Sequence, residues 1–91
     1  MDEQTRLYVK LYGIVQGVGM RYYINRQAQQ IGVKGYVRNL PDGCVECMVE
    51  GDKGQLEQFL SLVKNAPRGK VEDVEAEPVG CEQPFTRFEI R

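Results

Sequence analysis

Residues 33–51 read VKGYVRNLPDGCVECMVEG, and this stretch decides the fold because it contains two extended segments joined by a turn. Residues 33–40 and 44–51 are rich in residues that favour strands. In the second segment, one face carries Val45, Cys47 and Val49. In the Pro-Asp-Gly sequence at 41–43, proline fixes one torsion, aspartate can bond back to the backbone, and glycine accepts a positive φ. The stretch therefore predicts a β-hairpin.

The segment before the hairpin predicts a strand followed by a helix. Residues 6–13, RLYVKLYG, alternate as a half-buried strand does, with Leu7, Val9 and Leu11 on one face. Mostly apolar side chains then recur at helical spacing, at Met20, Tyr23, Ile24, Gln27, Ala28 and Ile31. Gly32 is expected to end this helix.

The segment after the hairpin predicts a helix followed by two strands. Asp52 and Gln55 resemble a capping box that starts a helix, and Ala66-Pro67 ends it. The apolar stripe of this helix consists of Leu56, Phe59, Leu60 and Val63. Residues 70–79 predict a fourth strand, and residues 87–91 a short last strand that buries Phe88 and Ile90.

This order predicts a single α+β domain over residues 1–91 with a ferredoxin-like βαββαβ sandwich. We expect one antiparallel sheet with both helices on one face, because the strands alternate and each helix has one apolar stripe. A short extra C-terminal strand completes it. We expect the carboxylates of Asp42, Glu46 and Glu50 to form the turn or face solvent, without acting as an acid–base pair.

Composition limits the possible functions. A 91-residue chain with a net charge of −1 has no general attraction to nucleic acid or to anionic membranes, so any anion site must be local. The polar, acidic start and the lack of a long apolar window predict a cytoplasmic protein without membrane contact. The chain contains no histidine, which excludes Ser-His and Cys-His nucleophile pairs.

The cysteines do not predict a redox or metal site. Cys44 and Cys47 have C-x-x-C spacing, but they lie in an alternating strand, where residues three apart face opposite ways. No histidine or second C-x-x-C completes a zinc site. We therefore expect Cys47 in the core and Cys44 near a turn. The role of Cys81 stays open.

A glycine-rich junction, GIVQGVGMR at residues 13–21, connects the first strand to the first helix. Its amides and the free N–H groups of the helix start could cradle an anion, and Arg21 offers a charged fork that matches phosphate oxygens. A plain turn with a surface arginine remains an alternative. A nucleotide loop is disfavoured, because neither G-x-G-x-x-G nor G-K-[ST] is present.

Two motifs give this junction a more specific interpretation. GIVQGVGMR resembles the acylphosphatase signature V-Q-G-V-G-F-R, and GYVRNLPDGCVE at 35–46 resembles the second signature of that family, G-[WY]-V-x-N followed by D-G-x-V-E. The resemblance covers essentially the whole chain and weakens only near residues 80–84. Met20 stands where the family usually has phenylalanine, which implies altered packing and unchanged chemistry.

The resemblance implies hydrolysis of acyl phosphates to a carboxylate and inorganic phosphate, without metal or organic cofactor. It places the catalytic roles on Arg21 and Asn39. It places the phosphate-binding backbone loop on Gln16, Gly17, Val18, Gly19, Met20 and Arg21. It also implies a small-molecule acyl phosphate as substrate and inorganic phosphate as product. We expect a monomer, with no nucleic acid or membrane as partner.

The same residues allow three other interpretations. Without the second signature, Asn39 is more simply a residue that shapes the turn. A βαββαβ domain with Tyr8 and Tyr12 on its open face could bind RNA, but the pI of about 5.4 and the incomplete motif disfavour this. A degenerate regulatory domain would bind an anion without turnover, and the presence of both Arg21 and Asn39 disfavours it.

Overall fold

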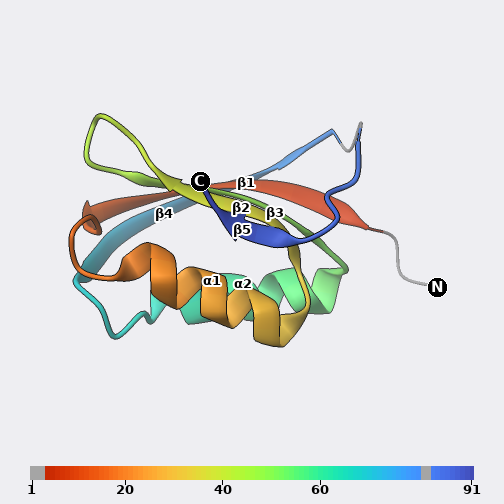
Figure 1. Ribbon diagram of the computed structural model, residues 1–91, viewed down its shortest axis with the longest axis horizontal. Helices are drawn as coiled ribbons and strands as arrows, with labels where there is room; N and C mark the ends of the chain where they lie inside the picture. The colour runs from red at the N-terminus through yellow and green to blue at the C-terminus, as the bar shows by residue number, and fades with distance from the viewer. Residues whose placement is uncertain (1–3, 81–82) are drawn as a thin grey trace.

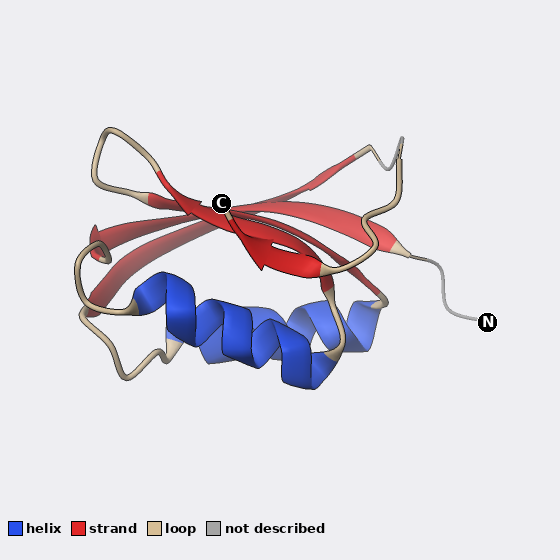
Figure 2. Cartoon of the chain, in the orientation of Figure 1, coloured by secondary structure: helices blue, strands red, loops and turns tan. Residues whose placement is uncertain are grey.

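The computed structural model describes residues 4–80 and 83–91, in which two helices pack on one face of a five-stranded sheet (Figures 1 and 2). The elements are β1 (Thr5–Ile14), α1 (Met20–Ile31), β2 (Lys34–Asn39), β3 (Val45–Gly51), α2 (Lys53–Lys64), β4 (Lys70–Val79) and β5 (Phe88–Ile90). This confirms the predicted α+β, ferredoxin-like arrangement. Cys81, with part of the predicted loop at 80–84, lies outside the described residues.

The sheet has the strand order β4-β1-β3-β2-β5 and is mixed. β1 pairs antiparallel with β3 and β4, and β2 pairs antiparallel with β3. The expectation of a wholly antiparallel sheet is wrong at one edge, where β5 runs parallel to β2. β4 ends opposite the start of β1, and β5 begins opposite the start of β2. The chain therefore re-enters the sheet at the end where β4 left it, and β5 must run in the direction of β2.

The core lies between the sheet and the helices. The fully buried side chains include Leu11, Met20, Ile24, Cys47 and Phe59. Burying each large apolar side chain contributes about 1.5–3 kcal/mol. Met20 and Cys47 thus occupy the core, as predicted, and Cys44 is buried beside the turn. No helix among the described residues has the length and apolar character needed to cross a membrane.

The local signals of the hairpin and of α2 are confirmed. The Asp42 side chain accepts a hydrogen bond from the Cys44 amide at 2.9 Å, and Gly43 has φ 93°. At α2, the Asp52 carboxylate accepts from the Gln55 amide, and the Gln55 side chain accepts from the Asp52 amide. These contacts satisfy amides that the turn and the helix start would otherwise leave without partners.

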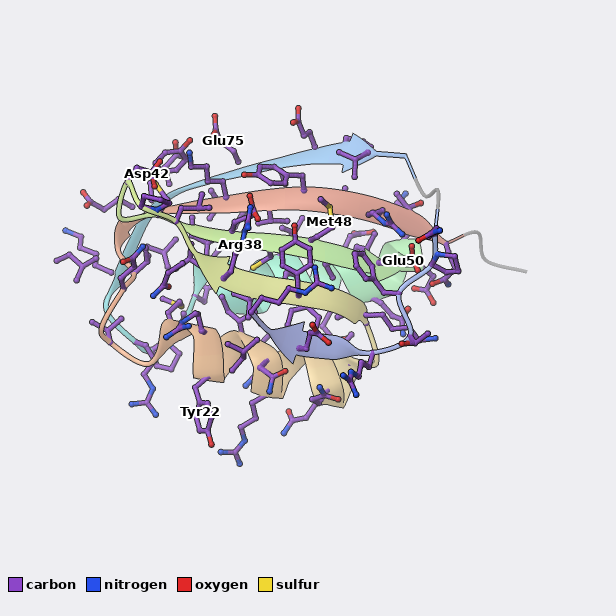
Figure 3. The ribbon with its side chains drawn as sticks, turned by 45° about the horizontal axis from the view of Figure 1, so that its top comes forward. Tyr22, Arg38, Asp42, Met48, Glu50 and Glu75 are labelled. Carbon is purple, nitrogen blue, oxygen red and sulfur yellow. The ribbon has the colours of Figure 1, made fainter. Side chains whose placement is uncertain are left out.

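The sheet face that the helices leave uncovered buries two acidic side chains that were expected to face solvent. Glu46 and Glu50 are each only 5% exposed, so their assignment as solvent-facing is wrong. Tyr8, Tyr36 and Arg38 all donate hydrogen bonds to Glu46. Figure 3 shows Arg38 and Glu50 on this face among the side chains of neighbouring strands. Burial alone would raise the pKa of Glu46, but the hydrogen bonds from Arg38 and Tyr8 outweigh burial and lower the pKa below its usual range.

Candidate active site

One end of the sheet collects the residues that the sequence singles out. β1 and β2 both pair antiparallel with β3, so they run parallel to each other, and β5 runs parallel to β2. The carboxyl ends of these three strands therefore lie at the same end of the sheet. The glycine loop follows β1 there, Asn39 is the last residue of β2, and Ile90 is the last residue of β5.

The φ angles of the loop are compatible with a backbone that binds an anion. Gly17 has φ 73° and Gly19 has φ 82°, whereas none of the described non-glycine residues has a positive φ. The sign of φ therefore alternates from Gln16 to Gly19, and in a backbone of this kind successive N–H groups can converge on one side. A side chain at Gly17 or Gly19 would be strained at these φ values.

The start of α1 adds donors to this loop. The first helical hydrogen bond runs from the Tyr23 amide to the Gly19 carbonyl, so the amides of the preceding turn have no partner within the helix. Within the described chain, no side chain caps Gly19, and the first turn contains no acidic residue. The positive end of the helix dipole therefore faces the loop without a competing carboxylate.

A cavity of about 160 Å³ brings these features together. Its lining comes from the loop and the start of α1 (Val15, Gly17, Gly19, Met20, Arg21 and Tyr22), from β2 (Asn39) and from β5 (Ile90). The structure thus places Arg21 and Asn39, which are 18 residues apart in the sequence, in one cavity.

Arg21 is the cationic side chain of this cavity. It lies in the first turn of α1 and is exposed. Within residues 4–80 and 83–91, its guanidinium takes part in no hydrogen bond or ion pair, so its donors are free for a ligand. A guanidinium presents a planar fork that pairs with two phosphate oxygens at once.

Asn39 faces the same cavity for a reason that can be followed along β2. Val37 is fully buried in the core on the helix side, and strand alternation places Asn39 on that same side. The Asn39 Oδ1 atom is buried and has no hydrogen-bond partner among the described residues. A buried acceptor without a partner is uncommon and costs stability, and this one lies in the same cavity as the glycine loop.

Two of the predicted loop residues direct their side chains elsewhere. The side-chain Nε2 of Gln16 donates to the carbonyl oxygens of Leu40 and Cys44, at 2.7 and 2.8 Å. It thereby ties the loop to the β2–β3 turn next to Asn39. Val18 packs against the core. For these two residues, the predicted contribution is from the backbone alone.

The sequence did not indicate every residue of the cavity. Ile90 was expected to be buried, but it is 37% exposed and forms part of the cavity lining. Phe88 is buried on the same strand, so alternation predicted the face of Ile90 correctly but not its position at the rim. Tyr22, which is 77% exposed, gave no signal beyond being next to Arg21.

The other features of the molecule suit a phosphate site less well. A hollow over β1 and β4 is lined by Glu75 and Glu77, which would repel an anion. In the described part of the chain, no group of three or more Cys, Asp or Glu side chains is arranged to hold a metal ion.

The open sheet face also differs from an RNA-binding surface. Arg91 lies 4.3 Å from the ring centre of Tyr36, and Arg6 lies 4.4 Å from that of Phe85. These cations cover rings on which bases would have to stack.

Comparisons with known proteins point to one family. A sequence profile of the family described as Acylphosphatase matches residues 7–90. A protein named acylphosphatase from Caldivirga maquilingensis is 44% identical over 93 residues, which cover 100% of this chain and 98% of that protein.

Solved structures give the same result. The crystal structure of acylphosphatase from Bacillus subtilis has a TM-score of 0.91 and 34% identity, and the match covers 96% of this chain and 98% of that chain. The structure of an acylphosphatase from Coxiella burnetii has a TM-score of 0.89 and 26% identity, with 97% of this chain and 93% of that chain covered.

Proposed function

Because this chain belongs to the acylphosphatase family, we propose that it cleaves the carboxyl–phosphate bond of acyl phosphates by the action of the glycine loop, Arg21 and Asn39. The chain is an acylphosphatase, a hydrolase, since acylphosphatases at 42–45% identity match it over most of its length. The proposal concerns how its own residues carry out the reaction.

The loop and Arg21 hold the phosphoryl group. The amides from Gln16 to Arg21 donate to phosphoryl oxygens, and the Arg21 guanidinium neutralises their charge. Because these groups are in place before substrate arrives, they stabilise the charge of the transition state without reorganising. Phosphoryl transfer depends mainly on such positioning and charge stabilisation.

The unpartnered Oδ1 of Asn39 is the observation that carries the proposal. This oxygen can accept a hydrogen bond from a water molecule and so orient one lone pair of that water toward phosphorus. A carboxamide is too weak a base to remove the proton, so an oxygen of the substrate phosphate accepts it. The bond from water oxygen to phosphorus forms, the bond from phosphorus to the carboxyl oxygen breaks, and the products are a carboxylate and inorganic phosphate.

The chemistry of the substrate explains why a chain without histidine suffices. A carboxylate is a good leaving group, so neither a strong nucleophile nor a general acid is needed. What remains for the protein is to bind the phosphate and to place the water. We further propose that the protein acts in the cytosol as a monomer, without a metal ion, nucleic acid or membrane, consistent with its net charge of −1.

The test is hydrolysis of benzoyl phosphate in ¹⁸O-labelled water containing EDTA. Attack of a positioned water on phosphorus places the label in inorganic phosphate, whereas attack on the acyl carbon places it in benzoate. We expect turnover that EDTA leaves unchanged, with the label in phosphate. Label in benzoate, or activity that is lost in EDTA and restored by a divalent cation, would contradict the proposal.

A further inference from the structure

A second groove adjoins the catalytic cavity on the outer side of α1. It has a volume of about 340 Å³, and its lining includes Gly19, Tyr22, Arg26 and Arg68, with Gln27 and Gln30. Gly19 and Tyr22 also line the catalytic cavity, so the two hollows are neighbours. Tyr22 projects from α1 away from the sheet (Figure 3). We call this hollow the arginine groove.

The two arginines of this groove are free to bind an anion. The cations of the open sheet face are paired, Arg6 with Glu50, Lys10 with Asp42 and Arg38 with Glu46. By contrast, Arg26 and Arg68 are exposed, and neither forms an ion pair or a side-chain hydrogen bond with any described residue.

The charge around the groove has one sign. Among the described residues, its lining includes no Asp or Glu. The chain from Gln4 to Pro41, which contains the loop and α1, has no acidic residue at all. The groove is therefore positive in a protein whose net charge is −1, and this field attracts anions.

The backbone holds Arg68 beside the loop. A Cβ placed on Gly19 would lie 4.0 Å from the Cδ and Nε atoms of Arg68. Gly69 has φ 57°, and a Cβ there would lie 2.0 Å from the Ile14 carbonyl oxygen, so the chain after Arg68 packs directly on the start of the loop. The backbone contact between Gly69 and Ile14 thus holds the neighbouring Arg68 beside the loop.

We propose that the arginine groove binds the acyl part of the substrate and favours acyl phosphates that carry a second negative charge on that part. This rests on the proposed function. With the phosphoryl group in the glycine loop, the acyl group extends from the cavity over Gly19 and Tyr22, and a carboxylate or phosphate on it meets Arg26 and Arg68. Guanidinium groups pair with either anion through two parallel hydrogen bonds.

Two aryl substrates that differ by one charge test the proposal. Benzoyl phosphate and 4-carboxybenzoyl phosphate have the same rigid ring, and the second carries a carboxylate that cannot reach back to its own phosphoryl group. The quantity to compare is the ratio of kcat/KM for 4-carboxybenzoyl phosphate to that for benzoyl phosphate. Because each enzyme is measured with both substrates, the electronic effect of the substituent cancels between enzymes.

The decisive variant is Arg26→Met/Arg68→Met. Its matched control is Lys34→Met/Lys53→Met, which removes the same charge. These lysines lie near the C-terminal end of α1 and at the N-terminal end of α2, two helix ends that are linked by the hydrogen bond from the Gln55 side chain to the Ile31 carbonyl. We expect the ratio to fall by about 5- to 10-fold in the arginine variant, because two exposed charge pairs are lost. In the control it should stay within about 2-fold of wild type. If the double variant does not fold, Arg26→Met alone should give part of the fall, since Arg26 lies on an exposed helix face.

The outcomes separate the two proposals. An unchanged ratio in the arginine variants overturns the subsite, and so does an equal fall in the lysine control, which would reflect overall charge alone. If the wild-type protein hydrolyses neither substrate, the proposed function is overturned instead. As a further check, added potassium chloride should lower the ratio of wild type toward that of the arginine variant.

Discussion

Asn39→Ala separates the proposed catalytic role of this residue from a purely structural one. If Oδ1 positions the attacking water, the variant loses one preorganised contact that the transition state needs. Removing one such group typically costs about 10²- to 10³-fold in kcat, or about 2.7–4 kcal/mol. The phosphate site should be retained, because the proposed phosphate donors are the loop amides and Arg21, not Asn39.

In contrast to kcat, the stability of the protein should not fall much in Asn39→Ala. A buried acceptor without a partner costs about 1–3 kcal/mol, and Asn39→Ala removes that acceptor together with a few packing contacts. The backbone pairing of residue 39 with Val45 does not involve the side chain. We therefore expect the free energy of unfolding to stay within about 1 kcal/mol of wild type or to rise.

Three measurements on the same preparation check this prediction. They are kcat with benzoyl phosphate, the free energy of unfolding in urea, and the gain in that free energy with inorganic phosphate. Phosphate at 100 times its Kd should stabilise both proteins by about 2.7 kcal/mol. Asn65→Ala is the matched control, since Asn65 caps the C-terminal end of α2, donates to the Ser61 carbonyl and does not line the cavity. A folded Asn39→Ala protein with near-normal kcat and lowered stability would refute the reasoning, because that is what a purely turn-forming asparagine predicts.

Four perturbations outside Asn39 have equally definite outcomes. Arg21→Lys keeps the charge but loses the bidentate fork, so kcat/KM should fall by about 10- to 100-fold and phosphate should stabilise the variant less in thermal unfolding; equal stabilisation would contradict this. Gln16→Leu removes two hydrogen bonds to the β2–β3 turn and should lower the free energy of unfolding in urea by about 1–3 kcal/mol, whereas an unchanged value would mean that the bridge contributes nothing. The pKa of Glu46 is lowered in the fold, so its stabilising contribution is present above its unfolded pKa, about 4.3, and is lost as pH falls through the folded value; acid unfolding of Glu46→Gln should therefore show a shallower pH dependence than wild type. Burial and the hydrogen bond to Glu46 raise the pKa of Tyr8 to about 12, so stability should decline between about pH 10 and 12, and Tyr8→Phe should lose less over that range.

The local features of the fold could be predicted because neighbouring residues determine them. The turn at 41–43 and the capping box of Asp52 and Gln55 depend on side chains that bond to a backbone two or three residues away. The helices followed from their apolar periodicity. Arg21 and Asn39 were indicated by motifs, and strand direction then places them at one end of the sheet.

The errors arose where the outcome depends on distant contacts. Glu46 alternates with core residues and therefore faces away from the helices, as expected. Whether that face is wet depends on Tyr8 and Tyr36 from the strands on either side, which no pattern within β3 reveals. Likewise, the position of Arg68 beside the loop results from the close backbone approach of Gly69 to Ile14.

The parallel pairing of β5 with β2 has a consequence for the folding kinetics of this protein. Val37 pairs with Ile90, and Ile90 lines the cavity, so the proposed catalytic cavity is complete only after a pairing between residues far apart in the sequence. Such non-local contacts form slowly because the chain must first lose the entropy of closing a long loop. Helical circular dichroism should therefore recover before turnover does during refolding. Activity would report the closure of the sheet edge rather than the collapse of the chain.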